Sequence, residues 1–443
     1  MIWRKVKLGD ILTESKIISE NPNPDRRIKV RLKVLGVEKR GLENEVEGAT
    51  KQYIRKAGQF IYGKQNFHKG AFGIVPQELD GFESSSDLPA FDVDKSCLPE
   101  FIFYFFKQGD FYLELAKIAS GVATQRINTS QLFELEIALP DLKIQKDLIA
   151  EIELLEKNGA KISTELNNQL LLVKKLRQQL LQDALQGKLV KQDPNDELAS
   201  ELLEKINAEK EKLIKEKKLK KEKELPPIGA EKIPFEIPKT WSWCKLGVIA
   251  LHSEAGVSYR AQELPAKENQ IGVIKTSAIT SGYFLEDKNK LLPNQQINID
   301  KIRINLDDII FCRASGSKGL AGKSCLVMNI PKAILILSDK SIRYVFSDNI
   351  SKKFIQYFNF STFATEYYQK LGTGKSTSMN NITREQFNNL PIPLPPLQEQ
   401  YRIVHKIEEL FQYCDSLEES INQSASQNEK LLQQVLREAL QNH

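Results

Sequence analysis

The chain has 443 residues, a hydrophobic content of 41%, and a formal net charge of +5 from 63 Lys and Arg against 58 Asp and Glu. This length predicts two to three domains with cores of their own, and the mild positive charge permits a nucleic-acid partner without requiring one. The longest apolar run, Phe101 to Phe106, is too short to span a membrane, and residues 1–5 do not form a signal peptide. Five cysteines without Cys-x-x-Cys spacing and four scattered histidines favour neither disulfides nor a zinc site, so we expect a cytoplasmic protein.

Residues 1–143 are expected to form a first globular block. A predicted strand at 59–62 is followed by the cation Lys64 and a polar loop, and two further polar segments follow along the block. Amide, hydroxyl and cationic groups on a short rigid base suit contacts with phosphates and base edges, although each residue alone is equally compatible with ordinary surface. The candidate DNA-binding residues of this block are Lys64, Gln65, Asn66, His68, Lys69, Ser86, Thr124, Gln125 and Arg126.

Residues 144–187 are predicted to form a long helix. Pro140 lies just before it and suits a helix start, because the N–H that proline lacks would have no partner within the helix there. Apolar residues recur in steps of three and four, which is typical of a coiled-coil seam. The predicted seam positions are Ile152, Leu155, Ile162, Leu166, Val173, Leu176 and Leu180.

Residues 188–236 are expected to connect this helix to a second block. The segment 204–224 holds nine lysines and six glutamates, and Pro226-Pro227 follows it. The lysines could bind nucleic acid, but the interleaved glutamates favour a solvated helix followed by a loose connector.

Residues 237–397 are expected to form the second block. A predicted strand at 308–312 is followed by the cation Arg313 and a polar loop, as in the first block. Comparable polar segments recur near 338–340 and 375–380, and this recurrence favours a shared binding role. The candidate DNA-binding residues here are Arg313, Ser315, Ser317, Lys318, Lys340, Lys375, Ser376, Thr377 and Asn380.

Residues 398–443 are predicted to form a second long helix. The preceding segment, Leu390 to Leu397, contains four prolines and resembles a polyproline ligand, but we favour a stiff extended segment that leads into the helix. The predicted seam positions are Ile407, Leu410, Leu417, Ile421, Leu431 and Val435.

The chain contains an internal repeat. Residues 135–187 align with residues 390–442 without a gap, with about 18 of 53 positions identical, and weaker similarity extends upstream in both copies. The predicted fold class is therefore α+β: two α/β blocks separated by two long antiparallel coiled-coil helices, with an internal pseudo-two-fold repeat. Proteins with two-fold symmetry commonly bind duplex DNA, with one half of the protein on each half of the site.

Each catalytic motif that the sequence resembles lacks a required residue. The segment 372–377 mimics a phosphate-binding loop, but Gln369 stands where the first glycine is required. Asn21 to Pro24 lacks the second adjacent proline and the aromatic residue of an amino-methyltransferase motif. The chain is expected to be non-catalytic, with no cofactor or metal site of its own.

The order of variable block, Leu-Pro-x-Leu-x-x-Gln segment and long helix resembles the DNA-specificity subunit of type I restriction–modification systems. The segments Gly187-Lys-Leu-Val190, Ile237-Pro-x-x-Trp241 and 391–400 support this resemblance, which covers nearly the whole chain. Two departures exist, because the first block lacks the Ile-Pro lead and the sequence ends where the first copy continues with Gly-Lys-Leu.

The resemblance implies two target-recognition domains that each read one half of a bipartite site in double-stranded DNA. It also implies that the helices set the spacing and dock two methyltransferase (modification) subunits, with restriction and translocation subunits outside them. S-adenosylmethionine, ATP and Mg are then expected on those partner subunits, and no membrane is involved. Two alternatives stay open at this point: a structural coiled-coil adaptor and a self-sufficient DNA methyltransferase.

Overall fold

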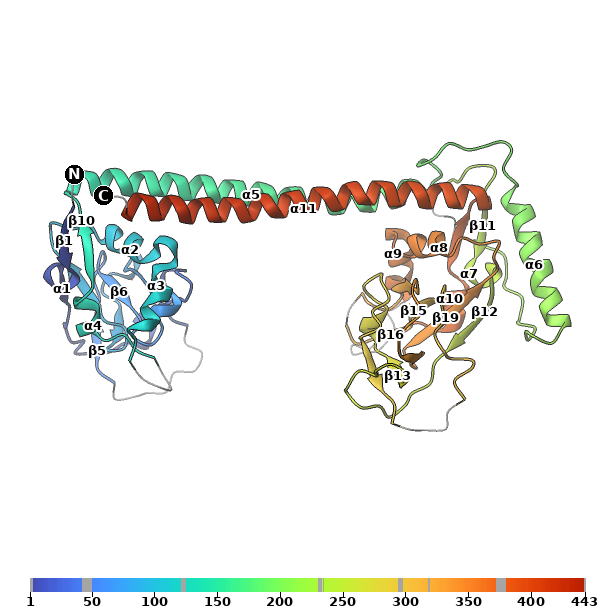
Figure 1. The fold of residues 1–443 in the computed structure, drawn as a ribbon, viewed down its shortest axis with the longest axis horizontal. Coiled ribbons are helices and arrows are strands. Elements are labelled where there is room, and N and C mark those ends of the chain that lie inside the picture. The colour runs from blue at the N-terminus through green and yellow to red at the C-terminus, as the bar shows by residue number, and fades with distance from the viewer. Residues whose placement is uncertain are drawn as a thin grey trace. The chain divides into compact units, whose positions relative to one another are not determined.

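The computed structural model describes residues 3–41, 50–120, 125–229, 233, 235–293, 298–317, 319–371 and 380–441. The chain divides into two compact units, and each unit contains one globular domain together with part of both long helices (Figure 1). Unit 1 consists of residues 1–169 and 420–443, and unit 2 consists of residues 170–419. No helix among the described residues has both the length and the apolar character needed to cross a bilayer.

The domain of unit 1 is built on a four-stranded antiparallel sheet in the order β2-β9-β6-β7. A tight group of aromatic side chains, including Phe60, Phe67 and Phe106, fills the space between this sheet and the helices. Its elements are β1 (Arg4–Lys7), α1 (Leu8–Ile11), β2 (Leu12–Glu14), β3 (Ile28–Val30), β4 (Val37–Lys39), β5 (Gln52–Ile54), β6 (Phe60–Tyr62), β7 (Phe72–Ile74), β8 (Glu83–Ser85), β9 (Ala90–Val93), α2 (Pro99–Lys107), α3 (Phe111–Glu114), α4 (Thr129–Phe133) and β10 (Glu136–Leu139).

The domain of unit 2 has a sheet of the same topology, in the order β12-β19-β15-β17, and a further sheet in the order β14-β13-β18. Its elements are β11 (Ser242–Lys245), α7 (Leu246–Ile249), β12 (Ala250–Ala255), β13 (Ile271–Ile274), β14 (Asn289–Leu291), β15 (Ile309–Cys312), β16 (Ala314–Ser315), β17 (Ser324–Leu326), β18 (Ile334–Ile336), β19 (Ser341–Phe346), α8 (Lys352–Asn359), α9 (Thr362–Leu371), β20 (Asn380–Asn381), α10 (Arg384–Asn388) and β21 (Pro391–Leu394).

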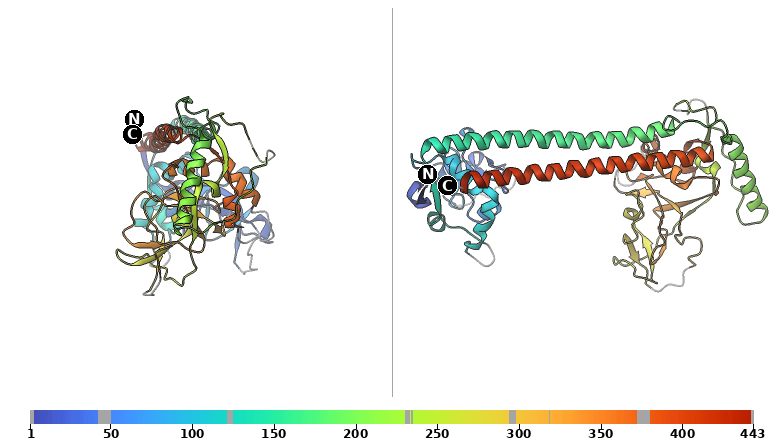
Figure 2. Two further views of the ribbon diagram at one scale, coloured as in Figure 1. Left: turned by 90° about the vertical axis from the view of Figure 1, so that its right-hand side faces the viewer. Right: turned by 45° about the horizontal axis from the view of Figure 1, so that its top comes forward.

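The two long helices, α5 (Leu142–Leu185) and α11 (Leu397–Gln441), run side by side (Figure 2). In unit 1, Asn428 Nδ2 donates to Gly159 O at 3.1 Å, and Leu436 packs in the same core as Ile152. In unit 2, Arg177 pairs with Asp415 at 2.5 Å and lies over the ring of Phe411. Residue numbers rise along one helix as they fall along the other, so the pairing is antiparallel. The predicted architecture of two α/β domains with two long paired helices is confirmed.

The predicted seam needs a correction. The residues of one predicted heptad row, Ile152, Val173, Ile407 and Ile421, are buried. Those of the second row are not: Ile162, Leu176, Leu417 and Leu431 are 44–61% exposed. The remaining predicted positions, Leu155, Leu166, Leu180, Leu410 and Val435, are half-buried.

The real second row lies one residue later along both helices. Ser163 and Arg177 on α5 contact α11, whereas their neighbours Ile162 and Leu176 face solvent. The same offset holds on α11, where Phe411 and Glu418 make contacts with Arg177. Hydrophobicity alone selected the wrong row because this seam is partly polar.

The shared Leu-Pro-x-Leu-x-x-Gln motif has a structural role. Gln145 is fully buried, where its amide donates to Pro140 O at 2.8 Å and accepts from Leu98 N at 2.8 Å. Gln400 repeats this arrangement, donating to Pro395 O at 2.9 Å and accepting from Ser351 N at 2.9 Å. Each glutamine therefore fixes the start of a long helix to its own domain.

Burial also tests the predictions for the proline-rich segment before α11 and for the charged segment after α5. Strand β21 is buried along its length and pairs with β11, so these prolines are not presented as a ligand. Helix α6 (Ala199–Lys215) is not solvated on all sides, because Leu202 and Ile206 are buried in the core of unit 2. Its charged face also contributes, since Lys210 Nζ donates to Gly247 O at 3.0 Å.

Candidate nucleic-acid interface

In unit 1, the backbone of Lys64 joins the three predicted polar segments. Its N–H donates to Asp87 O at 3.0 Å, and its carbonyl accepts from Ile127 N at 2.9 Å. The first bond reaches the segment containing Ser86, and the second reaches the segment containing Arg126. Main-chain bonds of this kind fix the relative positions of the segments whatever side chains they carry.

The loop after Lys64 is anchored in the domain core. A 3₁₀ turn (Phe67–Lys69) is anchored by the fully buried ring of Phe67 and ends at Gly70, whose φ of +78° suits glycine. Lys69 is exposed, whereas Lys64, Gln65, Asn66 and His68 are half-buried. Burial lowers the pKa of His68, so its imidazole is predominantly neutral near pH 7 and can both donate and accept a hydrogen bond.

Asp87, which lies in one of the predicted polar segments but was not among the candidate DNA-binding residues, pairs with Arg126 at 3.6 Å. Both side chains are about half exposed, at 51% and 42%, so the pair is weak and can be exchanged for other partners. Ser86 and Gln125 are exposed beside this pair. Thr124 lies outside the described residues.

Unit 2 repeats the same main-chain connections with different side chains. Arg313 N donates to Lys340 O at 2.9 Å, and Arg313 O accepts from Ile382 N at 2.8 Å. Strands β16 and β20 continue the second connection, placing Asn381 opposite Ala314. Asn381 precedes Ile382 as Arg126 precedes Ile127, so the two residues occupy equivalent positions.

The other candidate DNA-binding residues of unit 2 differ in how exposed their side chains are to a ligand. Ser317 and Lys340 are exposed and Arg313 is half-buried. Ser315 is buried, and its Oγ accepts from Ser317 N at 3.1 Å, so it stabilises the turn rather than facing a ligand. Lys318, Lys375, Ser376 and Thr377 lie outside the described residues, and only the backbone of Asn380 is described.

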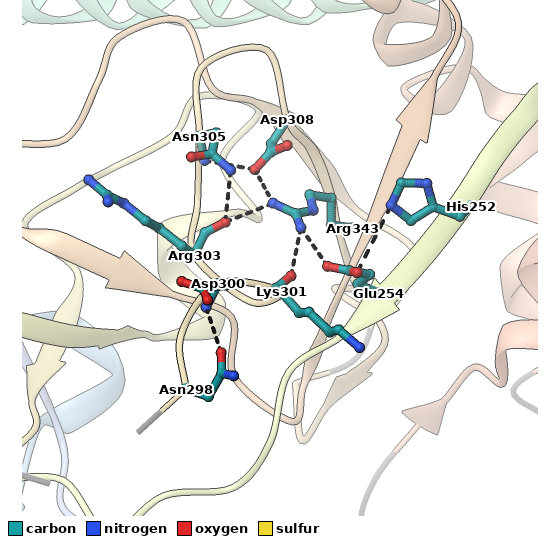
Figure 3. Close-up of polar contacts among 9 residues, drawn as sticks. All are labelled: His252, Glu254, Asn298, Asp300, Lys301, Arg303, Asn305, Asp308 and Arg343. Carbon is teal, nitrogen blue, oxygen red and sulfur yellow. Dashed lines mark hydrogen bonds and ion pairs between the residues drawn. The ribbon is translucent and has the colours of Figure 1, made fainter. Parts of the chain in front are cut away.

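A buried arginine supports the strand that leads to Arg313 (Figure 3). Arg343 on β19 is 5% exposed, and it donates to Asp308 at 2.8 Å and to Glu254 at 2.6 Å. It also donates to the carbonyls of Lys301 and Arg303, both at 2.7 Å. Burial raises the pKa of Asp308 although Arg343 acts in the opposite direction.

The first domain contains a buried arginine with a different environment. Arg55 is 1% exposed and donates to Ser84 Oγ at 2.7 Å, to Ser15 O at 2.8 Å and to Leu88 O at 3.1 Å. All three acceptors are neutral, and burial lowers the pKa of Arg55 to about 10. This cluster holds the segment around Ser84 that leads to Asp87.

Comparison with known proteins places these features in one family. The model of the type I restriction modification DNA specificity domain matches residues 2–172 and 238–427. The specificity subunit of the type I restriction enzyme EcoEI from Escherichia coli is 40% identical over 269 residues, which span 60% of this chain and 45% of that subunit.

Solved structures show the same fold. The HsdS subunit from Thermoanaerobacter tengcongensis is 15% identical with a TM-score of 0.55, and the match covers 99% of this chain and 96% of that one. A chain from a structure on complex assembly and conformational transition of the type I R-M system is 17% identical with a TM-score of 0.60, covering 99% of this chain and 97% of that one. Within the described ranges, no group of three or more His, Cys, Asp or Glu residues is arranged to hold a metal ion.

Proposed function

Since this chain belongs to the family of type I restriction modification DNA specificity domains, we propose that it reads a bipartite site in double-stranded DNA, one half with each domain. The observation that carries this proposal is the repeated main-chain scaffold around Lys64 and Arg313. Two equivalent frameworks with different side chains suit two half-sites of different sequence.

The chemistry of each scaffold suits DNA. Arginine can bind guanine through O6 and N7, asparagine can bind adenine through N6 and N7, and lysine binds phosphate as a compact charge. Unit 1 offers Lys64, Lys69 and Arg126, and unit 2 offers Arg313, Lys340 and Asn381. The Arg126–Asp87 pair can open on binding, because both groups retain access to solvent.

The proposal assigns different roles to the parts of the chain. Residues 1–143 and 237–397 are the two target-recognition domains, residues 144–187 and 398–443 are the spacer helices, and residues 188–236 connect them. The helices hold the domains at a set spacing and dock two methyltransferase subunits, while restriction and translocation subunits join outside. The partner subunits carry S-adenosylmethionine, ATP and Mg, and the complex acts in the cytoplasm.

The experiment that tests the reading function is methylation mapping. The chain is co-expressed with the methyltransferase subunit of its host, and modified adenines are located by long-read sequencing. We expect one motif with two specific parts separated by a spacer of fixed length. A continuous motif without a spacer would contradict the assignment of one half-site to each domain.

The spacing role has its own test. Residues 164–167 of α5 and 423–426 of α11 are removed together, since Gly159 lies next to Asn428 and these segments face one another in the antiparallel pair. Four residues correspond to about 6 Å and roughly one helical turn, so the seam can re-form. We expect the same two half-sites over a spacer shorter by about one or two base pairs, given about 3.4 Å per base pair. An active complex with an unchanged spacer would exclude the helices as the ruler.

A further inference from the structure

A strongly basic hairpin lies in unit 1 and was not among the predicted DNA-binding residues. Strands β3 and β4 pair antiparallel, with Lys29 opposite Glu38 and Val30 opposite Val37. Only two acidic residues, Asp25 and Glu38, occur between residues 25 and 40, and the acidic residues Glu43, Glu45 and Glu47 follow outside the described part of the chain. The basic residues of the hairpin are Arg26, Arg27, Lys29, Arg31, Lys33, Lys39 and Arg40.

The base of the hairpin is held by buried contacts. Ile28 is 3% exposed, and Arg40 N donates to Arg27 O at 2.8 Å. Arg27 lies 3.9 Å from the carboxylate of Glu83, which is itself buried and accepts from Ser19 Oγ at 2.7 Å. The base is therefore a fixed part of the domain.

The tip of the hairpin is attached to the candidate reading loop. Lys33 N donates to Lys69 O and Val34 N donates to Gly70 O, both at 2.8 Å. The fit is close, because a Cβ at Gly70 would lie 2.9 Å from Val34 N. These bonds make the hairpin and the reading loop a single continuous surface.

The tip adopts a costly backbone conformation. Lys33 and Val34 are consecutive residues with φ of 56°, a region that a β-branched residue such as valine rarely enters. Strain of this kind persists only where the surroundings impose it, and it often occurs where a ligand is bound. The side chain of Lys33 is exposed here, as is that of Lys69, whose carbonyl accepts from Lys33 N.

Most of the basic side chains are available to a ligand. Lys29 and Arg31 share the single carboxylate of Glu38 at 3.4 and 3.3 Å, and their side chains remain 56% and 47% exposed. Lys39 is 53% exposed and lies 3.9 Å from Asp25. Such exposed pairs contribute little to stability, so their charges are free to bind an external anion.

We propose that this hairpin is a second DNA-binding element of the first domain, whose cations bind backbone phosphates beside the half-site read from the Lys64 scaffold. The inference rests on the proposed function and adds to it. Phosphate contact is proposed because the exposed Lys29, Lys33 and Lys39 carry compact charges and arginine binds phosphate through its planar fork. In unit 2 the corresponding span, residues 256–308, contributes β13 and β14 instead, and two of its lysines, Lys275 and Lys290, are paired with Glu263.

The test is the salt dependence of DNA binding by the complex with its methyltransferase subunits. The variant is Lys29→Gln/Arg31→Gln/Lys33→Gln, and the matched control is Lys5→Gln/Lys95→Gln/Lys143→Gln, whose lysines are exposed elsewhere in unit 1. A plot of log affinity against log salt concentration has a negative slope, and each lost phosphate contact reduces the magnitude of that slope by about 0.9. Losing three contacts should therefore reduce the ratio of the affinity at 50 mM salt to that at 200 mM salt by about 40-fold. The methylated motif should stay unchanged.

The outcomes separate this inference from the proposed function. A slope equal to that of wild type and of the control triple overturns the hairpin proposal, and so does a changed base preference in the first half-site. Lys33→Arg keeps the charge and should keep the slope, which distinguishes lost charge from disturbed folding. A wild-type complex without any sequence preference refutes the proposed function itself, whereas the hairpin proposal is judged on the slope.

Discussion

The main-chain scaffolds around Lys64 and Arg313 share a backbone arrangement and differ in their side chains. In both, a cationic residue that closely follows an inner strand of the sheet donates one main-chain hydrogen bond and accepts another, Lys64 after β6 in unit 1 and Arg313 after β15 in unit 2. Where unit 1 places Asp87 and Arg126, unit 2 places Lys340 and Asn381. Because the framework depends on main-chain bonds, its side chains can change without loss of the fold.

The supports of these scaffolds differ in charge. Arg343 donates to two carboxylates and two carbonyls, whereas the hydrogen bonds of Arg55 within the described residues go to neutral oxygens, and its guanidinium also lies over the Tyr53 ring. The two buried arginines thus stabilise different parts of the scaffolds by different means, since Arg343 holds the strand that leads to Arg313 and Arg55 holds the segment that leads to Asp87. Stability measurements can separate the two cases.

The largest effect is expected from Arg343→Met compared with Arg55→Met. Removing Arg343 leaves Asp308 and Glu254 without their buried cation, which costs about 3–5 kcal/mol of unfolding free energy. Removing Arg55 leaves only neutral acceptors unsatisfied and costs about 1–3 kcal/mol. Denaturant unfolding measures both, with the exposed Arg26→Met as control. Equal losses for the two variants would show that the carboxylates are not the source of the difference.

A smaller change in unfolding free energy, of opposite sign, is expected at the hairpin of unit 1, where the described part of unit 2 has β13 and β14 instead. Lys33→Gly removes a side chain from the positive-φ region and should raise the unfolding free energy by about 1 kcal/mol. Lys33→Ala keeps the strain and should not stabilise. The same glycine variant should bind DNA more weakly, because a phosphate-binding charge is lost. Thermal unfolding together with a binding assay shows whether stability and affinity change in opposite directions.

The smallest effect concerns His252, which lies 4.0 Å from Glu254 beside Arg343. Burial lowers its pKa, and Arg343 adds to this while Glu254 and Asp308 oppose it. The folded state therefore binds the proton less readily than the unfolded state, whose pKa is about 6.5. This contribution to stability is complete above that pH and is lost as the pH falls below it. Urea unfolding at pH 7.5, 6.5 and 5.5 should show that the unfolding free energy of His252→Gln falls less with decreasing pH than that of wild type. Parallel falls would exclude His252 as the source of this pH dependence.

Much of the fold was predictable because the repeat and the helical periodicity are strong local signals. The second seam row was not, since Ser163 and Arg177 are polar residues that no hydrophobic pattern selects. Asp87 and Asn381 were not among the candidate residues for a similar reason, because their places in the two scaffolds depend on long-range main-chain bonds. The hairpin carried a usable signal in residues 27–33, where basic and aliphatic residues alternate strictly as in a β-strand.

We propose that each domain reads its own half of the DNA site. The most direct test maps methylation by complexes carrying Lys64→Ala/Arg126→Ala or Arg313→Ala/Asn381→Ala. Each lost base contact costs about 1–3 kcal/mol of discrimination. We predict that the first variant relaxes only one half of the bipartite motif and that the second relaxes only the other half. Equal relaxation of both halves by either variant, or damage to the same half by both, would contradict the account.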